Sequence, residues 1–448
     1  MADLLSIGAS GVKTYQTALA TVSENIANVG NGAYARRSTN VTELAPVQGV
    51  LSAAAAMTGY GSIATGINRA SDMFKSAAVR DSGADLARTQ AGTVWLNSIQ
   101  SALTGSDLST SLTNFFNAAQ SVAADPASPT PRAAMLESAT TVANAFTATG
   151  NALAQVTADM DASAEQATAS LTSLSAALAK VNDGLSRSAP NTAQAASLAD
   201  QRDSLLDQMS AIVDVHVTLD AAGRATVTAG GSNGPTLVSG NDAASVTYVR
   251  NGSGAVSFAV QMGGNYSVLT PNGGALGGIA DGAQRIADTR DQLNTLATNF
   301  VNGVNSVQAQ GRDLNNNAGQ PLFSVGAAPT DVSLALADPS GIAAAAVGGG
   351  TRDNSNILAL GTLRTSGGFE TKVTTLVAGN AAALQNRNAV AAAQSAIHDG
   401  AVSARDAVSG VDLDSEAVDL MRFQQAYSAS SRVIQAARDT FQSILEIR

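Results

Sequence analysis

The sequence predicts a mainly α-helical protein with a small β module, in which the two ends of the chain form one discontinuous coiled-coil domain. Apolar residues recur at alternating steps of three and four near both ends of the 448-residue chain, which is the narrow stripe of a coiled coil. Long alanine-rich segments of helical period lie between the ends. From Val213 the period changes to two, which is typical of a half-buried strand.

The first segment is expected to be a helix that begins at Asp3, a plausible N-cap, and ends at the turn residues 30–34. Because an isolated helix of this length is marginal in water, its apolar stripe needs a partner. The N-terminal stripe consists of Leu5, Gly8, Val12, Tyr15, Leu19, Val22, Ile26 and Val29.

Residues 35–67 show no regular period, so we expect an irregular segment there. Its end, GYGSIATG, resembles a phosphate-binding loop only superficially, because Gly59, Gly61 and Gly66 do not fit the GxGxxG spacing. Helical patterns then follow, the first of which carries apolar residues such as Phe74 and Val94, and the second a capping Ser106 or Asp107. These patterns cover residues 69–103, 106–123, 132–185 (as one helix or two) and 196–212.

Residues 213–275 are expected to form the small β module. Val213, Val215 and Val217 alternate with polar residues, and SVTYVRNGSGAVSFAV indicates a hairpin that turns at Asn251 and Gly252. The remaining segments are a helix over 279–310, a loop over 311–326, a flexible connector at 348–354 and a long helix over 370–409.

The final segment, which follows GVDLD at 410–414, carries a second stripe of the same spacing. Acidic residues crowd its first turn, and Arg438 and Arg448 lie near its end, as the helix dipole favours. We therefore expect residues 1–50 and 405–448 to pair as one terminal domain, and 51–404 to form an elongated helical rod. The C-terminal stripe consists of Leu420, Phe423, Tyr427, Ser430, Ile434, Ala437, Phe441 and Ile444.

The composition narrows the function classes. The formal net charge of −10 argues against a nucleic-acid partner, because neutralising phosphates requires clustered Lys and Arg. The chain has no cysteine, which excludes thiolate catalysis and disulfides. No cleavable signal peptide is expected, since Asp3 stands where a positive region should be. No apolar window of ~18 residues predicts a membrane helix.

No constellation of residues indicates catalysis, a cofactor or a metal site. The two histidines, His216 and His398, have no nucleophile or ligand at a suitable local spacing, so we expect both to be surface or structural. Carboxylates such as Glu165, Asp200 and Asp203 are expected to be solvated on polar helix faces. An enzyme is therefore not predicted.

The segment DLNNNAG places Asp313, Asn315 and Asn317 at the first, third and fifth positions of a calcium loop. Ala318 stands at the sixth position, where such loops need glycine, and Ser324 stands at the twelfth, where they need glutamate. We therefore expect an Asx-rich turn rather than a calcium site.

Both ends of the chain resemble a known family. LLSIGASGVKTYQTALATVSENIANV followed by GAYARR resembles the N-terminal signature of bacterial flagellar rod, hook and hook-associated proteins, and the segment from VDLDSEAV to FQSILEIR resembles their C-terminal signature. RFQQAY and FQSILEIR are most similar to the hook-associated proteins of the hook–filament junction. LADQRDSLLDQMSAIVDVHVTL and GRDLNNNAGQPLFSVG are similar to internal segments of that group. The residues that match the terminal motifs are Asn25, Asn28, Tyr34, Arg36, Arg422, Gln424 and Gln425.

The chain departs from the family pattern in two places. The usual Thr-Pro-Gly before the tyrosine is replaced by Asn31, Gly32 and Ala33, so that turn is expected to differ. Few residues separate LFSVG from the final helical region, so the outer β domain of longer relatives is expected to be absent or vestigial, at about residues 325–365.

The resemblance implies a non-enzymatic structural subunit of the flagellum, exported without a cleavable signal peptide through the flagellar type III apparatus. Its implied partners are other copies of itself, the hook protein, the next junction protein, filament subunits and an export chaperone that binds the C-terminal region. It implies no cofactor, no nucleic acid and no membrane partner. It also implies that both termini are disordered in the free subunit and fold on assembly, which withholds polymerisation until a template is present.

Other interpretations stay open. Within the family the chain is alternatively a hook or rod protein. From the pattern alone it is a soluble monomer or dimer with an internal coiled coil. From a different class, it is a secreted coiled-coil adhesin or effector, and a third alternative is an enzyme such as a wall hydrolase. The motif residues favour the hook–filament junction.

Overall fold

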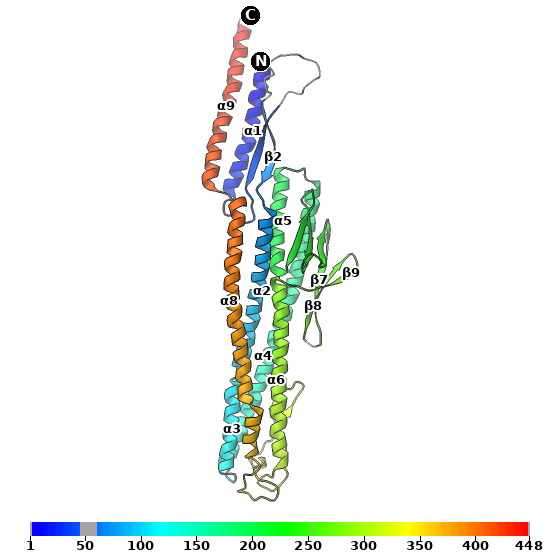
Figure 1. Ribbon diagram of the computed structural model, residues 1–448, viewed down its shortest axis with the longest axis vertical. Helices are drawn as coiled ribbons and strands as arrows, with labels where there is room; N and C mark the ends of the chain where they lie inside the picture. Colours follow the sequence, from blue (N-terminus) through cyan, green and yellow to red (C-terminus); the bar gives the residue numbers. More distant parts are fainter. Residues whose placement is uncertain (1, 45–60, 253, 447–448) are drawn as a thin grey trace.

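The computed structural model describes residues 2–44, 61–252 and 254–446. Residues 50 and 51, where we expected the domain boundary, lie outside the described residues, as do Gly59 and Arg448. The molecule is an elongated rod of long helices, and both chain ends lie at the same tip (Figure 1). The predicted fold class, mainly α with a small β module, is confirmed.

Long helices make up most of the described chain. Five of them exceed thirty residues: α2, α4, α6, α8 and α9. The segment that was expected to hold one helix or two is the single helix α4. The helices are α1 (Ala2–Ala27), α2 (Met73–Thr104), α3 (Leu108–Ala124), α4 (Pro129–Arg187), α5 (Ala193–Ile212), α6 (Gly274–Gln310), α7 (Ala359–Gly367), α8 (Phe369–Ser409) and α9 (Leu413–Glu446).

The strands form four separate sheets. A two-stranded ladder lies beside α1, a four-stranded and a three-stranded sheet form the β module, and a short pair lies near the far end of the rod. They are β1 (Arg37–Glu43), β2 (Ser62–Arg69), β3 (Val215–Leu219), β4 (Ala225–Ala229), β5 (Thr236–Ser239), β6 (Asp242–Ala243), β7 (Ser245–Arg250), β8 (Val256–Met262), β9 (Asn265–Leu269), β10 (Phe323–Val325) and β11 (Val332–Leu334).

We name α1, α9, β1 and β2 the terminal domain; β2 lies within the range 51–404 that we expected to form the rod. The helices α1 and α9 run antiparallel, and β1 and β2 pack against α1 (Figure 1). The expectation of an irregular segment over 35–67 is wrong for the described part, because β1 and β2 pair antiparallel from Arg37↔Arg69 to Glu43↔Ser62. Polar residues occupy both faces of these strands, so the sequence lacks the alternation that identifies a half-buried strand.

The rod is held together by a phenylalanine cluster at one end and by close helix contacts along its length. The ring of Phe300 lies 5.4 Å from that of Phe115 and 5.5 Å from that of Phe369. Further along, a Cβ at Gly278 would lie 2.5 Å from the backbone oxygen of Arg88, so α6 reaches α2 only because glycine is there. A chain poor in aromatic residues thus builds its core by close helix approach.

The β module packs on the side of α4 (Figure 1). In the hairpin of β7 and β8, Tyr248 pairs with Phe258 and Val246 with Val260. The buried Asn182 on α4 fixes the neighbouring sheet, because its amide donates to the Ala225 and Gly240 carbonyl oxygens at 2.8 Å. The module therefore stands on the rod rather than apart from it.

Several local expectations need correction. Helix α1 begins at Ala2, so Asp3 lies inside it and is not its N-cap. Asp107 is the N-cap of α3 but makes no capping hydrogen bond through its side chain. Phe74 and Val94 lie on α2 but are exposed. Within residues 325–365 the structure places β11, the 3₁₀ turn Pro339–Gly341 and part of α7.

Candidate functional site

The two predicted stripes meet each other along α1 and α9. The ring of Tyr15 lies 6.4 Å from that of Phe423, and further along, Gly8 faces Ile434. Val22 and Ala437 are fully enclosed. The structure thus brings residues from both ends of the chain into one helix pair.

Two glycines let the helices approach closely. A Cβ at Gly8 would lie 2.6 Å from Cγ1 of Ile434, and one at Gly11 would lie 2.6 Å from Oγ of Ser430. Contacts this short do not occur for real Cβ atoms, so a side chain at either position would force its neighbour on α9 to shift. Gly8 belongs to the predicted stripe, but Gly11 was missed because a period of apolar residues does not identify small residues on the contact face.

Only some residues of the two predicted stripes are buried between α1 and α9. The contact face of α1 is lined by smaller residues, because the helix lies between α9 and the β1–β2 ladder: Thr14 donates to the Ser62 carbonyl oxygen at 2.8 Å, and Thr39 donates to Thr21 at 2.9 Å. Stripe residues that are half-buried in the described chain are Val12, Tyr15, Leu19, Ile26, Leu420, Phe423, Ser430 and Ile434.

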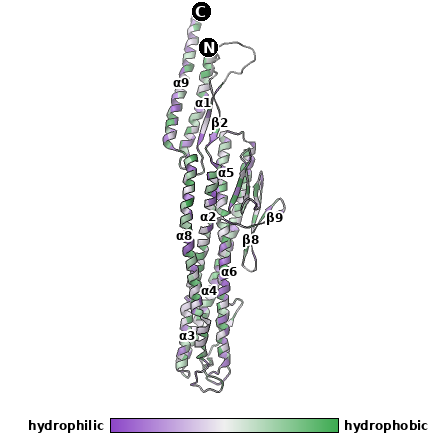
Figure 2. Cartoon of the chain, viewed as in Figure 1, coloured by the Kyte–Doolittle hydropathy of each residue, from purple (hydrophilic) through white to green (hydrophobic). Residues whose placement is uncertain are grey.

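The outer side of the helix pair exposes many large apolar side chains. On α9, Phe441 is 53% exposed and Ile444 is 51% exposed, although both belong to the predicted stripe. Val418 and Met421 are exposed too, outside the stripe. Figure 2 shows hydrophobic positions recurring along α1 and α9 among hydrophilic ones. The remaining exposed stripe residues are Leu5, Val29 and Tyr427.

A buried polar cluster joins the end of α1, and the segment that follows it, to the first turn of α9. The Asn25 amide donates to Glu416 at 2.9 Å and to the Arg37 carbonyl oxygen at 2.8 Å. Its oxygen accepts from the Tyr34 hydroxyl at 2.7 Å and from the Arg37 amide at 3.0 Å. Arg36 donates to Glu416 at 2.6 Å, and the Glu416 side chain is 0% exposed. All four hydrogen-bonding positions of Asn25 are therefore used.

A second set of ion pairs joins the terminal domain to the rod. Asp200 on α5 accepts from Arg37 at 2.8 Å and from Arg69 at 2.6 Å, and Arg69 also contacts Asp203 at 2.7 Å. The expectation that Asp200 and Asp203 are merely solvated is wrong, because both pair with arginines that come from β1 and β2. Glu165, in contrast, is exposed.

Tyr34 sits between these two sets, and we name the whole group, Asn25, Tyr34, Arg36, Arg37, Arg69, Asp200 and Glu416, the joint. The Arg37 guanidinium stacks over the Tyr34 ring at 4.8 Å. Burial raises the pKa of the Tyr34 phenol to about 12, against the opposing effect of Arg37. The phenol is therefore a fixed hydrogen-bond donor at neutral pH.

The motif residues divide into two groups. Asn25, Tyr34 and Arg36 come together in the joint, while Asn28 donates to the Glu24 carbonyl oxygen at 2.9 Å and shapes the turn after α1. Arg422 lies 5.4 Å over the Phe423 ring. Gln424 and Gln425 are exposed on α9 beside Arg422, so this second group faces outward.

The other candidate residues show no assembled chemistry in the described ranges. His216 is exposed on β3, and His398 is half-buried on α8 with Nδ1 3.2 Å from Oγ of Ser82. Asp313 accepts from the Asn315 and Asn317 amides at 2.8 and 2.7 Å, so its carboxylate serves its own turn. Within residues 2–44, 61–252 and 254–446 no group of three or more metal-ligating side chains gathers, and no helix has the length and apolar character of a membrane span.

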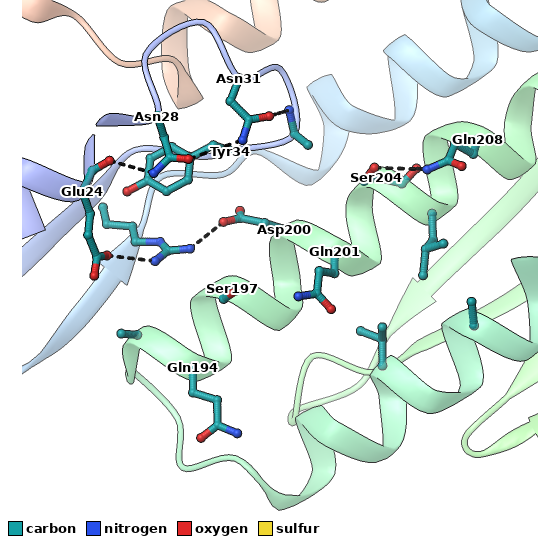
Figure 3. Close-up of a pocket in the computed structure, with 16 residues that line it drawn as sticks. Glu24, Asn28, Asn31, Tyr34, Gln194, Ser197, Asp200, Gln201, Ser204 and Gln208 are labelled. Carbon is teal, nitrogen blue, oxygen red and sulfur yellow. Dashed lines mark hydrogen bonds and ion pairs between the residues drawn. The ribbon is translucent and has the colours of Figure 1, made fainter. Parts of the chain in front are cut away.

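A groove of about 820 Å³ opens beside the joint (Figure 3). Helix α5 forms one wall through Ser197 and Gln201, and the turn that carries Asn31 and Tyr34 forms another. Its apolar lining comes from Ala177, Val181 and Leu205.

Comparison with known families gives two matches. The model of the flagellar hook-associated protein FlgK helical domain matches residues 96–323, and the model of the flagellar basal body rod FlgEFG protein C-terminal matches residues 404–447. The first covers half of the chain, from α2 through the β module to α6, and the second covers α9.

Two curated relatives carry the name of the same group of flagellar proteins. Flagellar hook-associated protein 1 of Salmonella typhimurium is 24% identical over 337 residues, which are 73% of this chain and 60% of that protein. The Escherichia coli protein of the same name is 24% identical over 339 residues with the same shares. The chain thus spans about 60% of the length of these curated relatives. The structure of the flagellar hook junction protein FlgK from Burkholderia pseudomallei aligns with a TM-score of 0.46 and 25% identity, over 55% of this chain and 47% of that one.

Proposed function

We propose that this chain, which belongs to the FlgK family of flagellar hook-associated proteins, is a structural subunit of the bacterial flagellum at the hook–filament junction. It polymerises on the hook through its terminal helices and offers the surface on which the next junction protein and the filament assemble. The observation that carries this proposal is the exposed apolar side of the α1–α9 pair, next to the joint that fixes the pair on the rod.

The exposed side of the pair supplies the energy for assembly. Full burial of one large apolar side chain stabilises by about 1.5–3 kcal/mol. Phe441, Ile444 and Met421 are each more than half exposed in the single chain, and they lie on the same helix. Covering several such side chains with neighbouring subunits supplies the burial that α9 lacks in the single chain.

The joint gives this surface a fixed direction. Because Arg36, Arg37 and Arg69 connect α9, α1 and the ladder to α5, the helix pair continues along the rod axis (Figure 1). A subunit of a tube needs its contact surfaces at constant angles to one another. The ion pairs of the joint hold the helix pair at a constant angle to the rod, whereas an exposed hinge would let that angle vary.

The partners follow from the family and the terminal surface. They are other copies of the chain, the hook protein, the next junction protein and filament subunits. Export occurs through the flagellar type III apparatus, and a chaperone covers the C-terminal region beforehand. The exposed apolar face of α9 is the surface that such a chaperone would need to cover.

The terminal helices order on assembly. On α9, Glu416 and Ala437 are the buried residues of the described helix, so most of its side chains stay partly or fully exposed in the single chain. Segments with few buried contacts open at low free-energy cost. The ordering cost withholds polymerisation until a hook supplies the missing neighbours.

A deletion tests the proposed function. A chain that lacks residues 410–448 should leave a folded rod, because α9 contributes little to the rod core, and should fail to bind hooks. A strain that carries the truncation should release filament protein into the medium without building filaments. Normal filaments on this truncated chain would refute the proposal.

The alternative of a hook or rod protein has one observation in its favour, which is the rod-protein match over residues 404–447. Immuno-labelling separates the two: label confined to the tip of the hook supports the junction, and label along the whole hook supports the alternative. Full motility of a null strain would instead favour a secreted adhesin or effector.

A further inference from the structure

An exposed aromatic side chain stands on the rod just below the terminal domain. Phe74, at the start of α2, is 80% exposed and its neighbour Met73 is 59% exposed. The Asp72 carboxylate accepts from the Phe74 and Lys75 amides at 2.9 and 3.2 Å, so the backbone that carries this knob is fixed by a helix cap. We name Met73, Phe74 and Lys75 the knob. Exposed aromatic side chains on a fixed backbone are typical anchors of protein interfaces.

The groove beside the joint lies on the opposite side of α5 from the knob. Ser197, Gln201 and Gln208 line the groove, at helical steps of four and seven that keep them on one face. Arg202 and Leu206 line a separate hollow, whose wall includes Met73 and Phe74, and at 100° per residue they point away from the groove face. One helix therefore separates a protruding anchor from a receiving groove at the same height on the rod.

The groove offers the knob both apolar surface and opposite charge. Its apolar lining, which includes Val181 and Leu205, offers a surface for an aromatic ring. Its charged lining residues are Glu24, Arg37 and Asp200, which leaves one negative charge in excess. Lys75 adds a positive charge directly beside Phe74. Glu24 pairs with Arg37 at 3.1 Å inside the groove, but its side chain is 49% exposed, so part of the carboxylate stays accessible to Lys75.

We infer that the knob of one copy of this chain docks in the groove of a neighbouring copy at the same height. A knob and a groove on different faces make a heterologous contact, which generates rings or helical tubes rather than closed pairs. This inference rests on the proposed function, because that function sets copies side by side around an axis. It adds a lateral contact on the rod to the contacts of the terminal helices.

The absence of cysteine from the sequence makes the contact directly measurable. Two variants, Lys75→Cys and Gln201→Cys, are prepared separately, mixed in equal amounts, bound to purified hooks and treated with a short thiol-specific cross-linker. Cross-linked dimers are expected in the mixture and not with either variant alone. The matched control replaces Gln201→Cys by Gln155→Cys, an exposed position on α4 outside the groove, and should give no dimers.

A truncation of the knob gives a second readout. Phe74→Ala removes an exposed side chain, so the fold should be unchanged, and the concentration for half-saturation of hooks should rise about tenfold. Val347→Ala, at a site that is 69% exposed in a loop, should leave it unchanged.

The outcomes separate this inference from the proposed function. Copies that bind hooks normally but give no mixed dimers, with Phe74→Ala neutral, would overturn the lateral contact alone. Dimers of Lys75→Cys with itself would show a face-to-face contact and would overturn it too. Failure of the unmodified chain to bind hooks at all would overturn the proposed function together with this contact.

Discussion

Arg36 and Glu416, which stand 380 positions apart in the sequence, form a 2.6 Å ion pair at the base of the terminal helix pair. Glu416 is fully buried, and Asn25 donates the second hydrogen bond to its carboxylate. The first turns of α9 are thereby attached to the segment that follows α1. The two chain ends are joined at this base by an ion pair and, further along α1 and α9, by contacts between apolar and small residues.

Removing Arg36 should loosen α9 from the assembly. Arg36→Ala leaves the Glu416 carboxylate buried without its cation. Breaking a fully buried pair costs about 3–5 kcal/mol, and this pair costs less because the Arg36 side chain is 34% exposed. Hydrogen exchange on the hook-bound chain should then speed up at least tenfold over the first turns of α9. Arg224→Ala removes one partner of an exposed pair and should change nothing there. Unchanged protection in Arg36→Ala would show that the pair does not hold α9.

Adding one methyl group at Gly8 should separate the terminal helices. Ala has the higher helix propensity by about 1 kcal/mol, so a Gly→Ala change in open space stabilises a helix. At Gly8 the new Cβ would meet Ile434 at 2.6 Å, and the packing clash should outweigh that gain. Gly400→Ala on α8 is the matched control, since its Cβ meets nothing within 4 Å. A hook-binding assay should show weaker binding for Gly8→Ala only, and equal binding of the two variants would contradict the close approach.

The joint should weaken at high pH through Tyr34. The phenol pKa is about 12 in the folded chain and about 10 when unfolded. A group with a raised folded pKa contributes stability that is complete below pH 10 and is lost as the pH rises through 12. Tyr34 is linked to the rod itself, because Arg37 stacks on its ring and pairs with Asp200 on α5. The melting temperature should therefore fall more steeply between pH 9 and 12 for the unmodified chain than for Tyr34→Phe, which has no proton to lose. Identical slopes would mean that Tyr34 is not held in the joint.

A charge in the stripe should damage assembly more than folding. Ile434→Asp places a carboxylate against Gly8, where neighbouring subunits are expected to close the surface, and burial of an unpaired charge is costly. Hook binding should be severely weakened, while the melting temperature of the free chain, which the rod core sets, should stay almost unchanged. Gln435→Asp introduces the same charge at an exposed position and should bind nearly normally. An equal fall in melting temperature for Ile434→Asp would show that the terminal helices already carry the stability of the monomer.

Periodicity predicted the long helices and the β module because each is a local pattern repeated many times. The steps of three and four between Leu420 and Ile444 identified α9, and the alternation that starts at Val213 identified the sheet. The ladder of β1 and β2 has no such repeat, since its residues are polar on both faces and gain their partners from α1 and from each other.

The joint could not be predicted from spacing. Asp200 stands 163 positions from Arg37 and 131 from Arg69, and only the tertiary fold brings them together. Motif residues gave a partial signal, because Asn25, Tyr34 and Arg36 were identified through family resemblance without their common partner Glu416. The exposure of single side chains could not be predicted either, because nothing in the sequence distinguishes Phe74, which is exposed to solvent, from Phe115, which is fully buried.

Hydrogen exchange along α9, compared between the free chain and the chain bound to hooks, shows whether the hook orders this helix. We expect fast exchange over residues 413–446 in the free chain and slow exchange after binding, with rod helices such as α4 protected in both. Full protection of α9 in the free chain, at the level of α4, would contradict the claim that the hook orders the terminal helices.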